Sequence, residues 1–517
     1  MRIATNVSAI VSNNALQKSQ DRLTKSIARL SSGYKINSSS DDAAGYAISE
    51  KMRLQLRGLN QADNNAADGV SVLHTAEGAM EEIQSMLARM KELSVQAANG
   101  TNSVDERSAI QSEIDSLNSE IDRISSNTEF NSQTLISGNL SRRVYSNYEG
   151  VNQIEVSDNF VAGNYGITIT QDARQAIVVG NGAVTMSDTA TVTKEQAGTI
   201  SMNGYGIEIS EGDTLAGIMG KLVDGADKIG GRVFAITAGA TNDTKVNGTD
   251  YAGYEPQTSY AGNNIVFMTK ESGSSKTMNI TCSNAELANM LGIATAATNS
   301  GMYAEGSDVQ AEFTLDNDGK RVGFADSAVI STSGTRVTVK DVNNRTFVTD
   351  VPSNVAGTQF SDTVKADDKS TATSTQTAKV TQEVTDVGTM SVHVGANENQ
   401  VILIDIPAVT SYTLGTENLN VMTSVTASEA IDTIDTAVAY ANRVRSQMGA
   451  YENRFEHTTN NLGTASENLT SAISTMTDTD MAEEMIEYTS LNVMTQAATS
   501  ILAQANERPS TVLQILQ

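Results

Sequence analysis

Hydrophobic residues recur at helical spacing over a long stretch near the start of this sequence. Alternating steps of four and three from residue 48 meet apolar or small side chains at nearly every position for about seven heptads, which is typical of a coiled-coil seam. The seam positions are Ile48, Met52, Gln55, Leu59, Ala62, Ala66, Gly69, Leu73, Ala76, Met80, Ile83, Leu87, Met90, Ser94 and Ala97. We predict one long helix here, ended by a left-handed stop at Asn99-Gly100.

Two further helices are indicated by capping boxes followed by apolar stripes. Ser103-x-x-Glu106 opens a helix with an apolar face of Ile110, Ile114, Leu117, Ile121 and Ile124. Thr426-x-x-Glu429 predicts the start of a C-terminal helix. Its seam is Ile434, Ala437, Ala441, Val444, Met448, Tyr451, Phe455, Thr458, Leu462, Ala465, Leu469, Ala472 and Met476. Stripes of this length would not stay exposed on a monomer, so we expect the two chain ends to pack against each other.

The outermost segments carry shorter heptads. Near the start these are Leu16, Leu23, Ile27, Leu30 and Tyr34, and near the finish Leu491, Met494, Ala498, Ile501, Ala505, Val512 and Ile515. Residues 1–43 hold six Lys or Arg against three Asp, whereas residues 478–517 hold six Asp or Glu against one Arg. Opposite charge favours pairing of the two segments. We expect both to be disordered or only transiently helical in the free subunit, and to order when many copies bury these seams together.

The middle of the chain has a different composition. Residues 131–420 contain 30 of the 38 Gly and three of the four Pro, together with dense Thr, Val and Ser. Short strands between turns are predicted at Tyr165–Thr170, Ala176–Val179, Thr199–Met202, Gly206–Ile209, Ile265–Thr269, Thr335–Val339 and Val401–Ile406. A helical pattern at Leu215, Ile218 and Leu222 follows two of them and predicts a β-β-α unit. The fold class is therefore α+β and multidomain, with a long antiparallel helical coiled-coil shaft and β-rich outer domains.

Composition excludes several classes of protein. The net charge of -26 argues against nucleic acid as a partner, because phosphate binding needs concentrated Lys and Arg. A single Cys, Cys282, forms no internal disulfide. The N-terminus lacks the apolar core of a cleaved secretory signal, and no stretch is long and apolar enough to cross a membrane.

Both chain ends resemble bacterial flagellins. The resemblance is carried by MRIATNVSAIVSNNALQKSQDRLTKSIARLSSGYKINSSSDDAAGYAISEKMR at the start and by NRFEHTTNNLGTASENLTSAISTMTDTDMAEEM and TQAATSILAQANERPSTVLQILQ at the end. MSVHVGANENQVILIDIP is similar to the strand pair before the C-terminal helix of that family. GTISMNGYGIEI with GDTLAGI is similar to an insert motif of flagellin outer domains.

The resemblance implies a layered organisation. Residues 1–43 and 480–517 form the filament core, 44–170 and 390–479 the shaft with a β-hairpin, and 171–389 one or two variable outer domains. It implies export without a cleaved signal, polymerisation into an extracellular filament for motility, and flagellar cap, junction and export-chaperone proteins as partners. The polymerisation residues are then Leu16, Leu23, Ile27, Leu30, Met494, Ala498, Ile501, Val512 and Ile515. Small seam residues such as Gly69 would let the filament lattice switch between nearly equal packings.

The resemblance also implies recognition by a host innate receptor, Toll-like receptor 5. The residues that match the family's receptor surface are Arg89, Leu93 and Glu113. Periodicity places Arg89 and Glu113 off the apolar seams and Leu93 at the edge of one. An ordinary solvated helix face carries the same kinds of residue. Spacing alone therefore does not distinguish a receptor-binding surface from a solvated helix face.

The residues give no support to catalysis, and we predict no catalytic, cofactor or metal site. The three His lack the His-Glu-x-x-His spacing of a metalloprotease helix. The Asp-rich turn at Asp316–Gly319 has Ser327 where a calcium loop needs Glu. Asp41-Asp42 is expected to cap the helix that starts near Ala43.

Three alternatives remain beside a filament subunit. A hook–filament junction protein shares both helical ends but forms no long filaments alone. A coiled-coil adhesin would not need heptads at both outermost ends. A carbohydrate-active lobe would need paired carboxylates, and none stands out among the many acidic residues.

Overall fold

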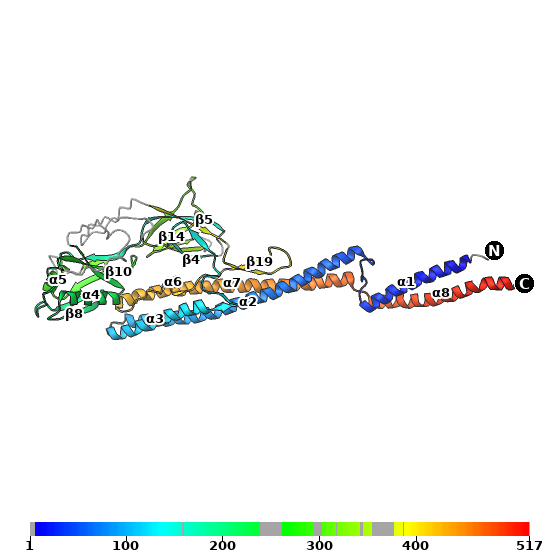
Figure 1. Ribbon diagram of the computed structural model, residues 1–517, viewed down its shortest axis with the longest axis horizontal. Coiled ribbons are helices and arrows are strands. Elements are labelled where there is room, and N and C mark those ends of the chain that lie inside the picture. The colour runs from blue at the N-terminus through cyan, green and yellow to red at the C-terminus, as the bar shows by residue number, and fades with distance from the viewer. Residues whose placement is uncertain are drawn as a thin grey trace. The chain divides into compact units, whose positions relative to one another are not determined.

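The long helices come from the two chain ends and the strands from the middle, which confirms the predicted fold class (Figure 1). The computed structural model describes residues 6–157, 160–237, 261–293, 302–316, 318–341, 345–353, 377–385 and 387–515, with side chains through residue 508. The helices are α1 (Val7–Ser32), α2 (Ala43–Ala98), α3 (Val104–Asn127), α4 (Leu215–Lys228), α5 (Ala285–Met290), α6 (Ser411–Leu414), α7 (Ser424–Thr477) and α8 (Met481–Ile515).

All seven strands predicted from the sequence are present, with ends that shift by up to three residues. The strands are β1 (Glu129–Phe130), β2 (Gln133–Thr134), β3 (Val144–Ser146), β4 (Asn152–Val156), β5 (Gly163–Gln171), β6 (Gln175–Val179), β7 (Gly198–Met202), β8 (Tyr205–Ile209), β9 (Gly231–Thr237), β10 (Asn263–Ser272), β11 (Thr277–Cys282), β12 (Met302–Glu305), β13 (Gln310–Phe313), β14 (Val329–Ser333), β15 (Arg336–Lys340), β16 (Thr346–Asp350), β17 (Ala378–Val384), β18 (Met390–His393) and β19 (Val401–Ile404). The predicted β-β-α unit is β7, β8 and α4.

The chain divides into two compact units. The first contains Met1–Val70, Val392–Ile402 and Asn453–Gln517, and the second contains Ser71–Ser391 and Leu403–Glu452. Helices α2 and α7 contribute to both units. Each unit has its own packing and is described separately below.

In the first unit, α1 and α8 form an antiparallel pair. The Asn6 amide donates to the carbonyl of Ala505 at 2.8 Å near one end. Arg29 pairs with Glu484 at 3.5 Å near the other end. Positions further along α1 therefore contact positions earlier in α8, and the start of α1 lies beside the end of α8 (Figure 1).

The two connections at the base of this pair are hydrogen-bonded to each other. Gly33 ends α1 with a φ of 77°, a left-handed conformation that glycine adopts without steric cost. The amide of Lys35 then donates to the carbonyl of Thr477 at 2.7 Å, and the amide of Thr479 donates to the carbonyl of Gly33 at 2.9 Å. These two backbone hydrogen bonds hold the turn after α1 against the turn before α8.

The predicted acidic cap of α2 is present, with the two aspartates in separate roles. The carboxylate of Asp42 accepts hydrogen bonds from the amides of Ala44 and Gly45, both at 3.0 Å. Asp41 instead accepts hydrogen bonds from the hydroxyl and amide of Ser38, which lower the pKa of its carboxyl below the ordinary value. One aspartate caps the helix, and the other closes the loop before it.

Most positions of the predicted seams lie on the packed faces of the α2–α7 pair, although Ala472, near the end of the α7 seam, is exposed. In the first unit Asn60 contacts Ser466 at 3.3 Å, and Gly69 lies against the ring of Phe455. In the second unit Gln84 donates to Asn442 at 2.7 Å. The fully packed part of the α2 seam starts at Ala62; earlier positions are half-buried or exposed, and Ile48 is 46% exposed.

Two predicted helix ends were wrong, for an identifiable reason. Neither Asn99 nor Gly100 has a positive φ, so α2 does not end in a left-handed stop. Arg107 of α3 supplies the missing donors instead: its guanidinium donates to the carbonyls of Ala97 at 2.9 Å and Asn99 at 3.0 Å. A side chain from the next helix satisfies the end of α2, which local sequence does not reveal.

The cap of α7 lies three residues before Thr426, so the predicted capping box was also wrong. The cap is Thr423, whose hydroxyl accepts from the amide of Thr426 at 3.1 Å, while the Thr426 hydroxyl accepts from the amide of Thr423 at 3.1 Å. The reciprocal pair is therefore made by two threonines rather than by Thr426 and Glu429. By contrast, the Ser103–Glu106 box that opens α3 is confirmed.

In the described residues, the β-rich part of the second unit contains two large hydrophobic cores and a small third cluster of Phe234, Val266 and Met268. The sheets β13-β5-β17-β3 and β14-β15-β16-β4 share one core, which includes an aromatic cluster of Phe160, Tyr165, Phe324 and Phe347 with ring centroids 5.1–6.3 Å apart. The sheets β12-β11-β7-β8 and β6-β10-β9 share the other core with α4 and α5. Strand β5 spans the predicted shaft boundary at residue 170 and pairs with β17 and β13.

Candidate functional site

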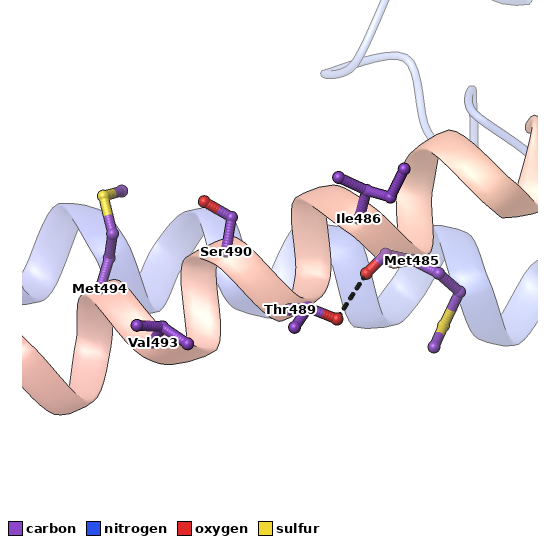
Figure 2. Close-up of a pocket in the computed structure, with 6 residues that line it drawn as sticks. All are labelled: Met485, Ile486, Thr489, Ser490, Val493 and Met494. Atoms are coloured by element: carbon purple, nitrogen blue, oxygen red, sulfur yellow. Dashed lines mark hydrogen bonds between the residues drawn. The ribbon is translucent and has the colours of Figure 1, made fainter.

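Helix α8 carries an open apolar surface on the side that does not face α1. Figure 2 shows its six lining residues along one helix, with α1 behind. They are Met485, Ile486, Thr489, Ser490, Val493 and Met494. Ile486 is 72% exposed and Val493 is 60% exposed. The Thr489 hydroxyl donates to the Met485 carbonyl at 2.8 Å, so it is satisfied within the helix.

The other side of α8 is already covered by α1. Leu491 is 2% exposed and Ala505 is 6% exposed, and from α1 Leu16 is 8% exposed. Helix α8 therefore has two apolar faces, one used within the subunit and one left in solvent. An open face that carries several large apolar side chains is typical of a protein–protein contact surface.

The predicted polymerisation residues of α1 and α8 divide between covered and open positions of the helix pair. Leu16 is buried, and Leu23, Leu30 and Ala498 are half-buried. Ile27, Met494 and Ile501 are exposed by 48%, 46% and 55%. The side chains of Val512 and Ile515 lie outside the described residues.

Sequence reasoning missed several exposed apolar residues of α1 and α8. Met485, Ile486 and Val493 on α8 and Val7, Ile10 and Val11 on α1 are exposed apolar residues absent from the predicted heptads. The sequence did contain a sign of this surface: the terminal segments hold more apolar residues than a single heptad stripe requires. A helix with apolar residues on more than one face requires more than one partner.

The opposite charges of the two terminal segments meet as predicted. Arg22 and Glu487 lie 3.2 Å apart with both side chains exposed, so their contribution to stability is about 0–1 kcal/mol. Arg29 and Glu484 lie 3.5 Å apart, and the Glu484 side chain is only 8% exposed. Both pairs join α1 to the first two turns of α8.

The predicted receptor residues lie where α2 meets α3, and one of them is buried. The guanidinium of Arg89 donates to the carboxylate of Glu113 at 2.9 Å, and this hydrogen bond raises the pKa of Arg89. Both side chains are exposed, as expected. Leu93, placed at the seam edge by the sequence, is 2% exposed and belongs to the packed interior.

The structure also brings together three polar groups that sequence spacing did not connect. His74 and Glu77 of α2 meet Glu452 of α7, with potential ligand atoms all within 4.8 Å of one another. In the Asp-rich turn, the Asp316 carboxylate accepts from the amides of Asp318 and Lys320 at 2.9 and 2.8 Å. Asn317 of that turn lies outside the described residues.

No helix within the described ranges combines the length and apolar character that crossing a bilayer requires.

Sequence comparison places both helical ends in known families. The bacterial flagellin N-terminal helical region matches residues 3–141, and the bacterial flagellin C-terminal helical region matches residues 431–516. A flagellin of Clostridium tyrobutyricum is 32% identical over 509 residues, covering 96% of this chain and 98% of that protein. A flagellin of Salmonella typhimurium strain LT2 is 30% identical over 547 residues, covering 100% of this chain and 99% of that protein.

The similar solved structures are distant. The structure of FliC from Burkholderia pseudomallei has 14% identity and a TM-score of 0.22, covering 75% of this chain and 99% of that one. The flagellar junction protein FlgL from Legionella pneumophila has 13% identity and a TM-score of 0.24, covering 79% and 99%. TM-scores this low carry no argument about this chain.

Proposed function

This chain belongs to the bacterial flagellin family and is a structural subunit of the flagellar filament, and we propose that it polymerises through the open apolar faces of the α1–α8 pair. The observation that carries the proposal is the surface of α8 around Ile486 and Val493, which remains in solvent after α1 has covered the opposite side. In a filament, neighbouring copies would bury it.

The energy available is substantial for such a small surface. Taking a large aliphatic side chain from full exposure to full burial contributes about 1.5–3 kcal/mol. Among the described side chains, α8 offers six partly to largely exposed ones: Met481, Met485, Ile486, Val493, Met494 and Ile501. Repetition along a filament multiplies this contribution by the number of copies. Disorder of the termini in the free subunit would prevent premature association, since the surface would form only on docking.

Electron microscopy of subunits incubated with short filament seeds tests this mechanism. A variant with Ile486→Ser and Val493→Ser should remain monomeric, because both side chains are exposed in the subunit and their loss removes only the intermolecular contact. Gln496→Ser is the matched control, an exposed polar position on the same helix, and should elongate the seeds as wild type does. A parallel chain lacking about 40 residues at each end should also fail to elongate.

Seed elongation by the double variant at the wild-type rate would contradict the proposal. Circular dichroism must show that the variant retains the helical content of wild type, so that loss of elongation is not caused by unfolding. Rings or short caps from the wild-type chain would instead favour a junction-type protein.

We further propose that the subunit is exported unfolded without a cleaved signal, with cap, junction and chaperone proteins as partners. The family relationship and the single Cys, which leaves no internal disulfide to break, support this route. Fusion of the first 60 residues or so to a reporter, with secretion measured in strains with and without the flagellar export apparatus, tests it. Equal secretion from both strains would exclude the route.

For the host receptor, Toll-like receptor 5, we propose that Arg89 and Glu113 make the contact and that Leu93 supports them from inside. The exposed Arg89–Glu113 pair on α2 and α3 favours this assignment. The double substitution Arg89→Ala and Glu113→Ala should lower potency in a receptor-reporter assay at least tenfold. Arg123→Ala, which removes an exposed arginine of α3, is the control and should leave potency unchanged. Equal potency of all three proteins would refute the assignment.

A further inference from the structure

A histidine and two glutamates converge on the surface of the α2–α7 pair in the second unit. His74 Nε2 lies 3.5 Å from Glu452 Oε1, and one ligand atom from each of His74, Glu77 and Glu452 falls within 4.8 Å of the others. We propose that these three side chains bind a divalent transition-metal cation, with Zn²⁺ as the representative ion. This proposal is independent of filament assembly.

The helix geometry explains why the groups converge. His74 and Glu77 are three residues apart on α2 and therefore project from the same helix face. Glu452 comes from the antiparallel helix α7, on the opposite side of the seam. The neighbouring residues Leu73 and Tyr451 are 2% and 3% exposed, so the backbone positions beneath the site are fixed by core packing.

The donor set selects a class of cation. One imidazole nitrogen with two carboxylate oxygens suits Zn²⁺ and its neighbours in the first transition series, whereas Mg²⁺ and Ca²⁺ prefer oxygen ligands alone. Three protein ligands leave a fourth position for water. The side chains of His74, Glu77 and Glu452 are 58%, 42% and 39% exposed, so a cation reaches them directly from solvent.

The local charge also favours a cation. One of the two carboxylates is paired with a guanidinium: that of Arg445 lies 3.1 Å from Glu77 Oε1. Arg445 thus occupies one glutamate oxygen and competes with a metal for it. A bound divalent ion would neutralise the remaining negative charge and would join α2 to α7, two helices far apart in sequence. Because the unfolded chain cannot hold these ligands together, binding stabilises the folded state.

Isothermal titration of the full-length, chelator-treated chain with Zn²⁺ tests the proposal. Wild type should bind one Zn²⁺ at this site, and His74→Ala should weaken that binding at least tenfold. His457→Ala is the matched control, because His457 is an exposed histidine of α7 that belongs to no such group in the described part of the chain. It should bind as wild type does, and Mg²⁺ should give no such binding.

A gain-of-binding variant separates a built site from adventitious surface binding. Arg445→Met releases Glu77 and removes the competing charge, so it should tighten Zn²⁺ binding several-fold. The melting temperature of wild type should rise with Zn²⁺ and that of His74→Ala should not, while circular dichroism without metal shows that both are folded. The proposal is overturned if wild type binds no Zn²⁺, if His74→Ala binds as tightly as wild type, or if both histidine variants weaken binding equally.

Discussion

Placing a methyl group at Gly69 of α2 tests how closely the two seams pack. A Cβ built on Gly69 would lie 2.9 Å from Cζ and 3.1 Å from Cε1 of Phe455, which is itself 0% exposed. Overpacking of this kind costs about 1–3 kcal/mol, while replacing a helical glycine by alanine contributes about 1 kcal/mol of helix propensity. The net effect of Gly69→Ala is therefore between neutral and a loss of about 2 kcal/mol.

Gly78 of the same helix provides the matched control. A Cβ at Gly78 would meet no atom within 4 Å, so Gly78→Ala gains the same propensity with no clash. The difference between the two variants isolates the packing cost, because the propensity contribution cancels. Urea unfolding followed by circular dichroism should place the midpoint of Gly69→Ala below that of Gly78→Ala, by a difference equivalent to about 1–3 kcal/mol at constant m-value.

Equal midpoints for the two alanine variants would refute the reasoning, since Phe455 would then have moved aside at no cost. Phe455→Leu in the Gly69→Ala background should restore part of the loss, because the ring that meets the new methyl group is gone. The same contact bears on filament shape: Gly69→Val, with a larger side chain, should alter the supercoil seen by electron microscopy. A wild-type supercoil would count against sliding at this seam.

Three other perturbations follow from the structure. Thr423→Ala should lower the free energy of unfolding by about 1 kcal/mol, measured by urea unfolding, because it removes the observed cap of α7. Arg107→Met should speed amide hydrogen exchange in the last turn of α2, which loses the donors to its terminal carbonyls. Burial raises the pKa of Glu429, so its charge opposes folding at neutral pH, and Glu429→Gln should stabilise the chain relative to the exposed control Glu417→Gln. That advantage should fade as the pH falls through the raised pKa of Glu429 toward the ordinary value. In this range Glu429 of the folded wild type becomes protonated and is then neutral, like the glutamine of the variant.

The sequence by itself determined the long helices of both chain ends, seven of the strands, and the packing of the two chain ends against each other. Heptad spacing identifies the faces of α2 and α7, because a 3.5-residue repeat on a helix of 3.6 residues per turn leaves one continuous stripe that must be buried. The Ser103–Glu106 box and the Asp42 cap were predictable for a similar reason: each depends only on residues within one helical turn. The strands follow from alternation between turn residues.

Features that join residues far apart along the chain were decided only by the tertiary structure. The end of α2 depends on Arg107 reaching back from α3, and the burial of Leu93 depends on what packs over the seam edge. The His74–Glu77–Glu452 group exists only because α7 returns antiparallel to α2 at one particular register. The open face of α8 is likewise defined by the side that α1 leaves uncovered. Local spacing fixes which residues share a face, whereas packing decides which faces are covered and which polar groups meet.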